Sequence, residues 1–112
     1  MVLLLVHFTA AMKMWHDPLT IGNTRLIDLS SLTKLPPNVK IVGKAEFDNP
    51  SGSIKDRLVK HMLDHHEQSG RLTPNSGQTV VAASSGNTAA SLSMFASLRG
   101  YRCIIVTNSK TS

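Results

Sequence analysis

The order of apolar runs and helical periods from residue 40 onward is the feature that most restricts the fold. Residues 79–83 and 102–106 are short, mainly apolar runs rich in valine and isoleucine, which is typical of buried strands. Residues 54–69 and 88–99 repeat their apolar positions with a helical period, whereas residues 40–47 alternate as a strand with one polar face does. The order strand, helix, strand, helix, strand predicts an α/β fold with a parallel sheet.

Each predicted helix has one side that we expect to be buried. In the first helix, Ile54, Leu58 and Met62 recur every four positions, with Val59 and Leu63 beside them. Both helices are followed by a glycine, a common C-terminal stop. In the second helix the expected core side is formed by Leu92, Phe95 and Ala96.

The size and charge of the chain limit its partners. It has 112 residues, the size of one small domain, and a formal net charge of +5. With 41% hydrophobic and 17% charged residues, its composition is typical of a globular protein. The basic residues are scattered, with few aromatics between them, so we expect no nucleic-acid partner.

Cysteine and histidine give little indication of redox or metal chemistry. The single cysteine, Cys103, lies in an apolar run, where we expect it to pack as a small hydrophobe. A lone cysteine excludes an intrachain disulfide and favours a reducing compartment, so we expect a cytoplasmic location. His61 and His65 are four positions apart, but no third ligand stands out, and we expect no metal site.

We expect residues 1–19 to be an apolar lead-in and residues 20–112 to be the N-terminal part of an incomplete domain. The apolar stretch at residues 2–6 is far shorter than the roughly 20 residues that span a bilayer, so we expect no membrane segment. It also lacks a basic leading region, although the small residues 9–11 leave a secretory cleavage site as the alternative.

Two loops contain residues that could take part in catalysis or ligand binding. In residues 49–57, Lys55 stands in the first turn of a predicted helix. The electropositive helix N-terminus disfavours a charged lysine there, and a neutral amine is the nucleophile that forms a Schiff base with an aldehyde. The structural alternative is an ordinary surface lysine with Asp56 nearby.

The second loop, residues 84–88, combines hydroxyl groups, a glycine and a predicted helix start. Such a loop offers free backbone N–H groups to a carboxylate or a phosphate. The same residue types also form ordinary capped turns, so this loop alone does not decide between an anion site and a plain turn.

Taken together, the two loops resemble the motifs of fold-type II pyridoxal-phosphate (PLP) enzymes. The similarity is greatest to the cysteine synthase and cystathionine β-synthase family. Asn-Pro-Ser-Gly-Ser-x-Lys-Asp-Arg at residues 49–57 is followed by Ser-Gly-Asn-Thr at residues 85–88, which places Asn87 32 positions after Lys55. Residues 21–24 resemble the family's opening, and residues 99–106 resemble the cystathionine β-synthase strand.

The resemblance implies a role for each matching residue. Lys55 matches the lysine that forms the Schiff base with PLP and later moves the substrate's α-proton, and Asn87 matches the asparagine that hydrogen-bonds the cofactor's 3′-oxygen. The implied reaction removes a β-substituent from a serine-like amino acid and then adds a thiol. The loop that holds the substrate's carboxylate is matched by Ser84, Ser85, Gly86 and Thr88.

The resemblance also implies a larger protein. Its fold would be a three-layer, tryptophan synthase β-like α/β architecture, of which this chain is the N-terminal part, and the full-length form would be a homodimer. Family members continue for roughly another two hundred residues, more than one domain's usual size. That part carries the glycine-rich loop for the PLP phosphate and the polar residue facing the pyridine nitrogen. We therefore expect this chain alone to be inactive or nearly so.

The sequence departs from the family pattern at several positions. Arg25 stands where the family usually has proline, Ser84 replaces a threonine, and Ala89 and Ala90 follow the second motif where glycine is usual. These changes leave cofactor attachment as the expectation and bear on substrate preference.

Two other interpretations remain open at the level of sequence. The first is a truncated, non-catalytic paralogue that retains the fold and acts through a partner. The second is a basic anion-binding module unrelated to PLP, which would require that Lys55 be replaceable without consequence.

Overall fold

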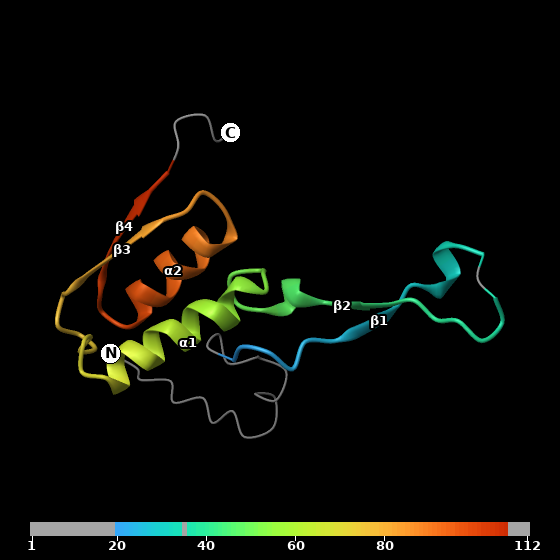
Figure 1. Cartoon of the computed structure of the whole chain (residues 1–112), viewed down its shortest axis with the longest axis horizontal. Coiled ribbons are helices and arrows are strands. Elements are labelled where there is room, and N and C mark those ends of the chain that lie inside the picture. The colour runs from blue at the N-terminus through green and yellow to red at the C-terminus, as the bar shows by residue number, and fades with distance from the viewer. Residues whose placement is uncertain (1–19, 35, 108–112) are drawn as a thin grey trace, which may run out of the picture.

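The computed structural model of the chain describes residues 20–34 and 36–107, so the lead-in predicted for residues 1–19 lies outside the described residues. Figure 1 shows a small α/β body from which a two-stranded ribbon extends. The helices are α1 (Lys55–Gln68) and α2 (Asn87–Leu98), with short 3-10 turns η2 (Ser30–Leu32) and η3 (Glu46–Asp48). The strands are β1 (Leu26–Asp28), β2 (Val42–Lys44), β3 (Thr79–Ala83) and β4 (Arg102–Val106).

The α/β body confirms the predicted strand–helix–strand unit. β3 and β4 pair in parallel, with Thr79 opposite Arg102 and Ala83 opposite Val106. Helix α2 connects them and packs against both strands, and α1 packs against α2. The strand bounds match the prediction because each apolar run is enclosed by turn residues that stop the strand.

The core lies between α1, α2 and the face of the parallel strand pair that the helices cover. Val59 and Leu63 of α1 are buried in it, and the predicted core side of α2 is confirmed, since Leu92, Phe95 and Ala96 are buried. The inward side chains of the strands, including Cys103, pack against this cluster as partly buried residues, which confirms the packing role expected for the cysteine.

The prediction that residues 40–47 contribute a strand to the parallel sheet is wrong. β2 runs antiparallel to β1, with Leu26 opposite Lys44 and Asp28 opposite Val42, and this pair forms the ribbon. Parallel strands are usually buried on both faces and read as continuous apolar runs. The alternation of lysine and apolar residues in this segment instead suits a ribbon with exposed residues on both strands.

The buried side of α1 also differs from the prediction. Val59 and Leu63 face the core, but Ile54, Leu58 and Met62 are about half exposed, at 52%, 47% and 47%. The buried stripe is shifted by one position and begins with Asp56, whose side chain is fully buried. Periodicity located the helix, whereas contact with α2 decided which side became the core.

Among the described residues, the parallel sheet has helices on one face only. Val81, Ile104 and Val106 point to the other face and are 52–63% exposed. The described residues therefore form a mixed α/β unit with a parallel strand pair, and none of its helices is long and apolar enough to cross a membrane.

The C-terminal end of α1 is joined to the segment after α2 by polar contacts. The Arg99 guanidinium donates to Asp64 Oδ1 at 2.6 Å and to Glu67 Oε2 at 2.9 Å. The Tyr101 hydroxyl donates to Glu67 Oε1 at 2.8 Å, and burial, followed by this hydrogen bond, raises the pKa of Tyr101 to about 12. These contacts hold α1 against the end of α2.

Ser91 provides a test of the packing between the helices. Its hydroxyl is fully buried and has no hydrogen-bond partner among the described residues. We expect Ser91→Ala to raise the free energy of unfolding by about 1 kcal/mol, because a buried hydroxyl without a partner is destabilising. Urea unfolding would measure the change.

The matched control is Ser97→Ala, at an exposed position of the same helix. It changes only helix propensity, for which we expect about 0.5 kcal/mol or less. If Ser91→Ala raises the free energy of unfolding by no more than Ser97→Ala does, the buried Ser91 hydroxyl is not destabilising, which would contradict the prediction.

Candidate functional site

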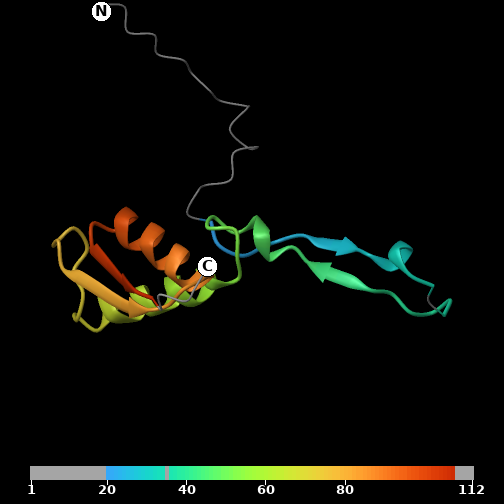
Figure 2. The same ribbon diagram turned by 90° about the horizontal axis from the view of Figure 1, so that it is seen from above.

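The two predicted loops lie at the same end of the α/β body. Both helices begin at this end, where β3 and β4 also finish, as the two views in Figures 1 and 2 show. Lys55 is the first residue of α1 and Asn87 is the first residue of α2. In α/β folds ligands collect at this end of parallel strands, so the arrangement gives the two loops a common location.

The amine of Lys55 has no hydrogen bond or ion pair with any described residue. The residue is half-buried, and its backbone N–H donates to Ser53 Oγ at 3.2 Å. The neighbouring carboxylate of Asp56 is buried and accepts hydrogen bonds from the backbone N–H of Ser51, at 2.7 Å, and from its hydroxyl. Asp56 is therefore engaged within the loop and is not paired with Lys55.

The second loop presents polar groups that are not engaged elsewhere. No described residue hydrogen-bonds to the side chains of Ser84, Ser85, Asn87 or Thr88. Ser84 and Thr88 are half-buried, whereas residues 85–87 are exposed. The Gly86 carbonyl accepts from the N–H groups of Ala89 and Ala90, which forms the first turn of α2. Because the hydroxyl groups of Ser84, Ser85 and Thr88 are not engaged by described residues, the loop at the start of α2 can offer them to an anion.

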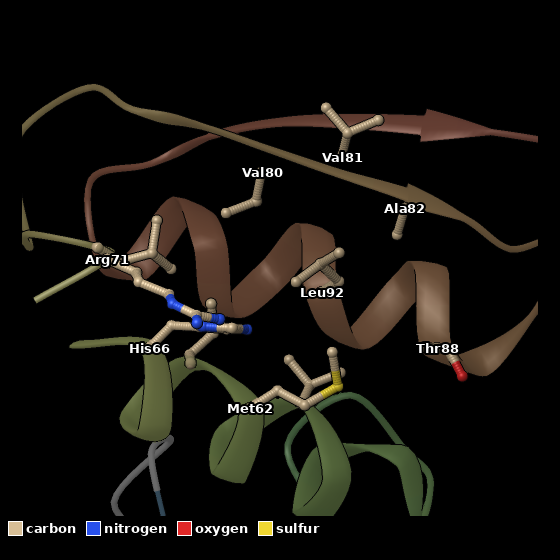
Figure 3. A pocket seen from close by; sticks show the side chains of 11 residues that line it. Met62, His66, Arg71, Val80, Val81, Ala82, Thr88 and Leu92 are labelled. Atoms are coloured by element: carbon tan, nitrogen blue, oxygen red, sulfur yellow. The ribbon is translucent and has the colours of Figure 1, made fainter. Parts of the chain in front are cut away.

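A cavity of about 330 Å³ lies between α1, α2 and β3. Figure 3 shows Thr88 at one end of it and the side chains of His66 and Arg71 at the other. Apolar side chains such as Val80 and Leu92 line most of it. Of the predicted site residues only Thr88 reaches this cavity, so the polar loops and the apolar cavity are adjacent but different surfaces.

The loop before Lys55 is held by a carboxylate that the sequence analysis did not identify. Glu46 accepts from Arg57 Nε and Nη2 at 2.8 and 2.9 Å, from Thr24 Oγ1 at 3.0 Å and from Asn49 Nδ2 at 2.8 Å. The hydrogen bonds from Arg57, ahead of those from Asn49 and Thr24, lower the pKa of Glu46 to about 2, against the opposing effect of burial. This cluster joins η3, α1 and the segment before β1.

The segment before β1 approaches α1 closely at Gly22. Its N–H donates to Asn49 Oδ1 at 2.9 Å. A side chain at this position would place its Cβ 2.9 Å from Nη1 of Arg57, and the φ of +91° also favours glycine. The positive φ thus explains the glycine of the family-like opening, and the nearby Arg57 guanidinium, which Glu46 holds, leaves little room for a side chain.

Arg25, which replaces the proline usual in the family, has a partner of its own. Its guanidinium donates to both carboxylate oxygens of Asp48 at 2.8 Å, and its backbone N–H donates to Asp48 Oδ2 at 3.4 Å. A proline has no N–H for the last of these contacts. The substitution therefore adds a link between the segment before β1 and η3.

The contacts that support the first loop were not predicted from the sequence, although Asn49, Asp56 and Arg57 belong to its motif. Glu46, Asn49, Asp56 and Arg57 are partners across the fold or across a tight loop, and no local periodicity marks such pairs. The available signal was Asp56 itself, because an acidic residue in the first turn of a helix often interacts with groups at its N-terminus.

Comparison with known proteins places these features in a family. The sequence model described as pyridoxal-phosphate dependent enzyme matches residues 18–112. The chain belongs to this family of PLP-dependent enzymes. The match confirms the resemblance that the motifs around Lys55 and Asn87 indicated.

Within the PLP enzyme family, the chain is similar to cystathionine beta-synthases. It is 44% identical over 102 residues to that of Apis mellifera, covering 89% of this chain and 20% of the relative. It is also 44% identical over 93 residues to that of Saccharomyces cerevisiae, covering 82% of this chain and 18% of the relative. The chain thus spans about a fifth of the length of these relatives.

Solved structures of PLP-family relatives agree with the fold. An O-ureido-L-serine synthase matches with a TM-score of 0.77 and 36% identity, covering 88% of this chain and 30% of that one. The O-acetylserine dependent cystathionine beta-synthase of Helicobacter pylori matches with a TM-score of 0.72 and 30% identity, and the match covers 82% of this chain and 30% of that one.

The Glu46 cluster predicts a pH dependence of stability. A carboxylate whose folded-state pKa is lowered stabilises the fold above its unfolded pKa, near 4.5, and loses this contribution as the pH falls through about 2. We expect Glu46→Gln to be less stable than the unsubstituted chain above pH 4.5, and the difference to narrow between pH 4.5 and about 2. Urea unfolding across this range would measure it, and a pH-independent difference would contradict the assignment.

Proposed function

We propose that this chain forms the N-terminal part of a PLP-dependent enzyme of sulfur amino-acid metabolism, similar to cysteine synthase or cystathionine β-synthase. The reaction class is β-replacement or lyase chemistry on a serine-like amino acid. The observation that carries the proposal is the amine of Lys55, which has no partner among the described residues and lies at the same end of the fold as the open loop at residues 84–88.

The residues present fit the cofactor in two respects. Lys55 is a half-buried residue at the start of α1, and no described residue engages its amine. An amine is the group needed to bind an aldehyde covalently. Asn87 begins the second helix with its amide side chain unengaged by described residues, and we propose that it hydrogen-bonds the 3′-oxygen of PLP. When bound, PLP would supply the electron sink for chemistry at the substrate's α-carbon.

The protein's own contribution would be orientation and proton transfer. Ser84, Ser85, Gly86 and Thr88 would hold the substrate's carboxylate at the start of α2, where backbone N–H groups and the helix dipole favour an anion. This anchoring would fix which bond at the α-carbon is activated. The Lys55 amine would take the proton from the substrate's α-carbon and later return it.

For the complete enzyme we propose the three-layer, tryptophan synthase β-like architecture, a homodimer and a cytoplasmic location. Two features support an additional layer. One face of the β3–β4 pair is exposed among the described residues, and the solved relatives that match this chain are about three times its matched length, since it covers 30% of each.

Reductive labelling tests the role of Lys55. The purified chain would be mixed with PLP, reduced with borohydride and digested, and pyridoxyl-lysine would be mapped by mass spectrometry. We expect Lys55 to be labelled in preference to the other lysines, because its unengaged amine stands at the start of α1, at the same end of the body as the loop at residues 84–88, in the position that the family uses for attachment.

The matched variants are Lys55→Ala and Lys60→Ala, the latter removing an exposed lysine of the same helix that pairs with Asp64. Only Lys55→Ala should abolish the preferred label. Labelling spread evenly over the lysines, or its absence, would overturn the proposal for this chain and favour a non-catalytic paralogue.

A further inference from the structure

The loop that leads into Lys55 is closed by a buried carboxylate. Asp56 is 0% exposed and accepts hydrogen bonds from the backbone N–H of Ser51, at 2.7 Å, and from the Ser51 hydroxyl. Between them the chain makes a tight turn, in which Gly52 has φ of +84° and donates its N–H to the Asn49 carbonyl at 2.8 Å. The Asp56–Ser51 contact therefore closes a loop that includes Lys55, the residue immediately before Asp56.

The direction of the Lys55 side chain depends on this closed loop. Its amine is not held by any described residue, so its own polar end does not fix it. The backbone on either side of this side chain is fixed by hydrogen bonds. The Lys55 N–H donates to Ser53 Oγ at 3.2 Å, and the carboxylate of the next residue, Asp56, accepts from the Ser51 N–H. The position from which the amine extends is thus set by the Asp56–Ser51 contact.

Burial of Asp56 is costly unless its charge is compensated. An ionised carboxylate away from water needs hydrogen-bond donors or opposite charge. Asp56 has two donors from Ser51 and lies in the first turn of α1, where the helix dipole favours a negative charge. Both oxygens are directed to Ser51, which separates this carboxylate from any role as the counter-ion of Lys55.

We infer that Asp56 is a positioning residue for Lys55, acting through Ser51 to hold the attachment amine in one direction. It makes no contact with substrate or cofactor in this role. The positioning itself is a property of the loop, whereas its consequence for PLP rests on the proposed function.

Acylation of lysine amines by a trace of acetic anhydride reports on positioning without PLP. The label on Lys55 would be compared with that on Lys40, an exposed lysine of the ribbon segment with no partner among the described residues. We expect Asp56→Asn to raise the Lys55-to-Lys40 ratio by about fivefold, the factor that matches loss of one hydrogen bond. The reason is that the loosened loop opens a residue that is half-buried in the folded chain.

Two further variants separate positioning from charge and from general destabilisation. Ser51→Ala removes one donor and keeps the Asp56 charge, and we expect a smaller rise in the same direction. Asp64→Asn removes a carboxylate from the same helix that is paired with Lys60 and Arg99, and we expect no change in the ratio. If Asp56→Asn does not fold, Ser51→Ala carries the test.

Reductive labelling with PLP then gives a response of opposite sign. In Asp56→Asn and Ser51→Ala the preference of PLP for Lys55 should fall while acylation of Lys55 rises, a combination that unfolding alone does not produce. An unchanged acylation ratio in folded Asp56→Asn and Ser51→Ala, or an equal rise in Asp64→Asn, would overturn the inference. If the unsubstituted chain shows no PLP preference, the proposed function fails and the acylation ratios still decide the role of Asp56.

Discussion

The geometry around the candidate site depends on the carboxylate of Glu46. Four hydrogen bonds, two from Arg57 and one each from Thr24 and Asn49, converge on it and join three segments that are distant in sequence. The apolar core lies elsewhere, between α1, α2 and the parallel strands. The α/β body is therefore stabilised by burial of apolar side chains, whereas the loop that leads into Lys55 is positioned by the hydrogen bonds of the Glu46 cluster.

The features that sequence reasoning predicted are those fixed by nearby residues. The strands at residues 79–83 and 102–106 are enclosed by turn residues, and the helices at Lys55 and Asn87 begin after loops rich in serine, glycine and asparagine. Local periodicity and turn chemistry are enough to find such elements. The two motifs, with Asn87 32 positions after Lys55, then indicated the family by resemblance. In the structure both residues begin helices at one end of the fold.

The features that the sequence did not predict depend on contacts across the fold. Whether β2 pairs with a parallel neighbour or with β1 depends on which partner strand is available, although its alternation of lysine and apolar residues favours the exposed ribbon. The core side of α1 is decided by packing against α2: Val59 and Leu63 join the buried cluster, whereas Leu58 and Met62 stay about half exposed. The Glu46–Arg57 pair spans 11 positions and a change of chain direction, so no single period marks it.

Helix α1 is anchored at both ends by arginine–carboxylate contacts. Arg57 is bound to Glu46 near its first turn, and Asp64 and Glu67 near its last turns are bound to Arg99. A helix of 14 residues is about 21 Å long, and a slide along its axis by one turn would break both sets of contacts together. The axial register of α1, and with it the start of the helix at Lys55, is therefore fixed by two sets of contacts together and not by any single carboxylate.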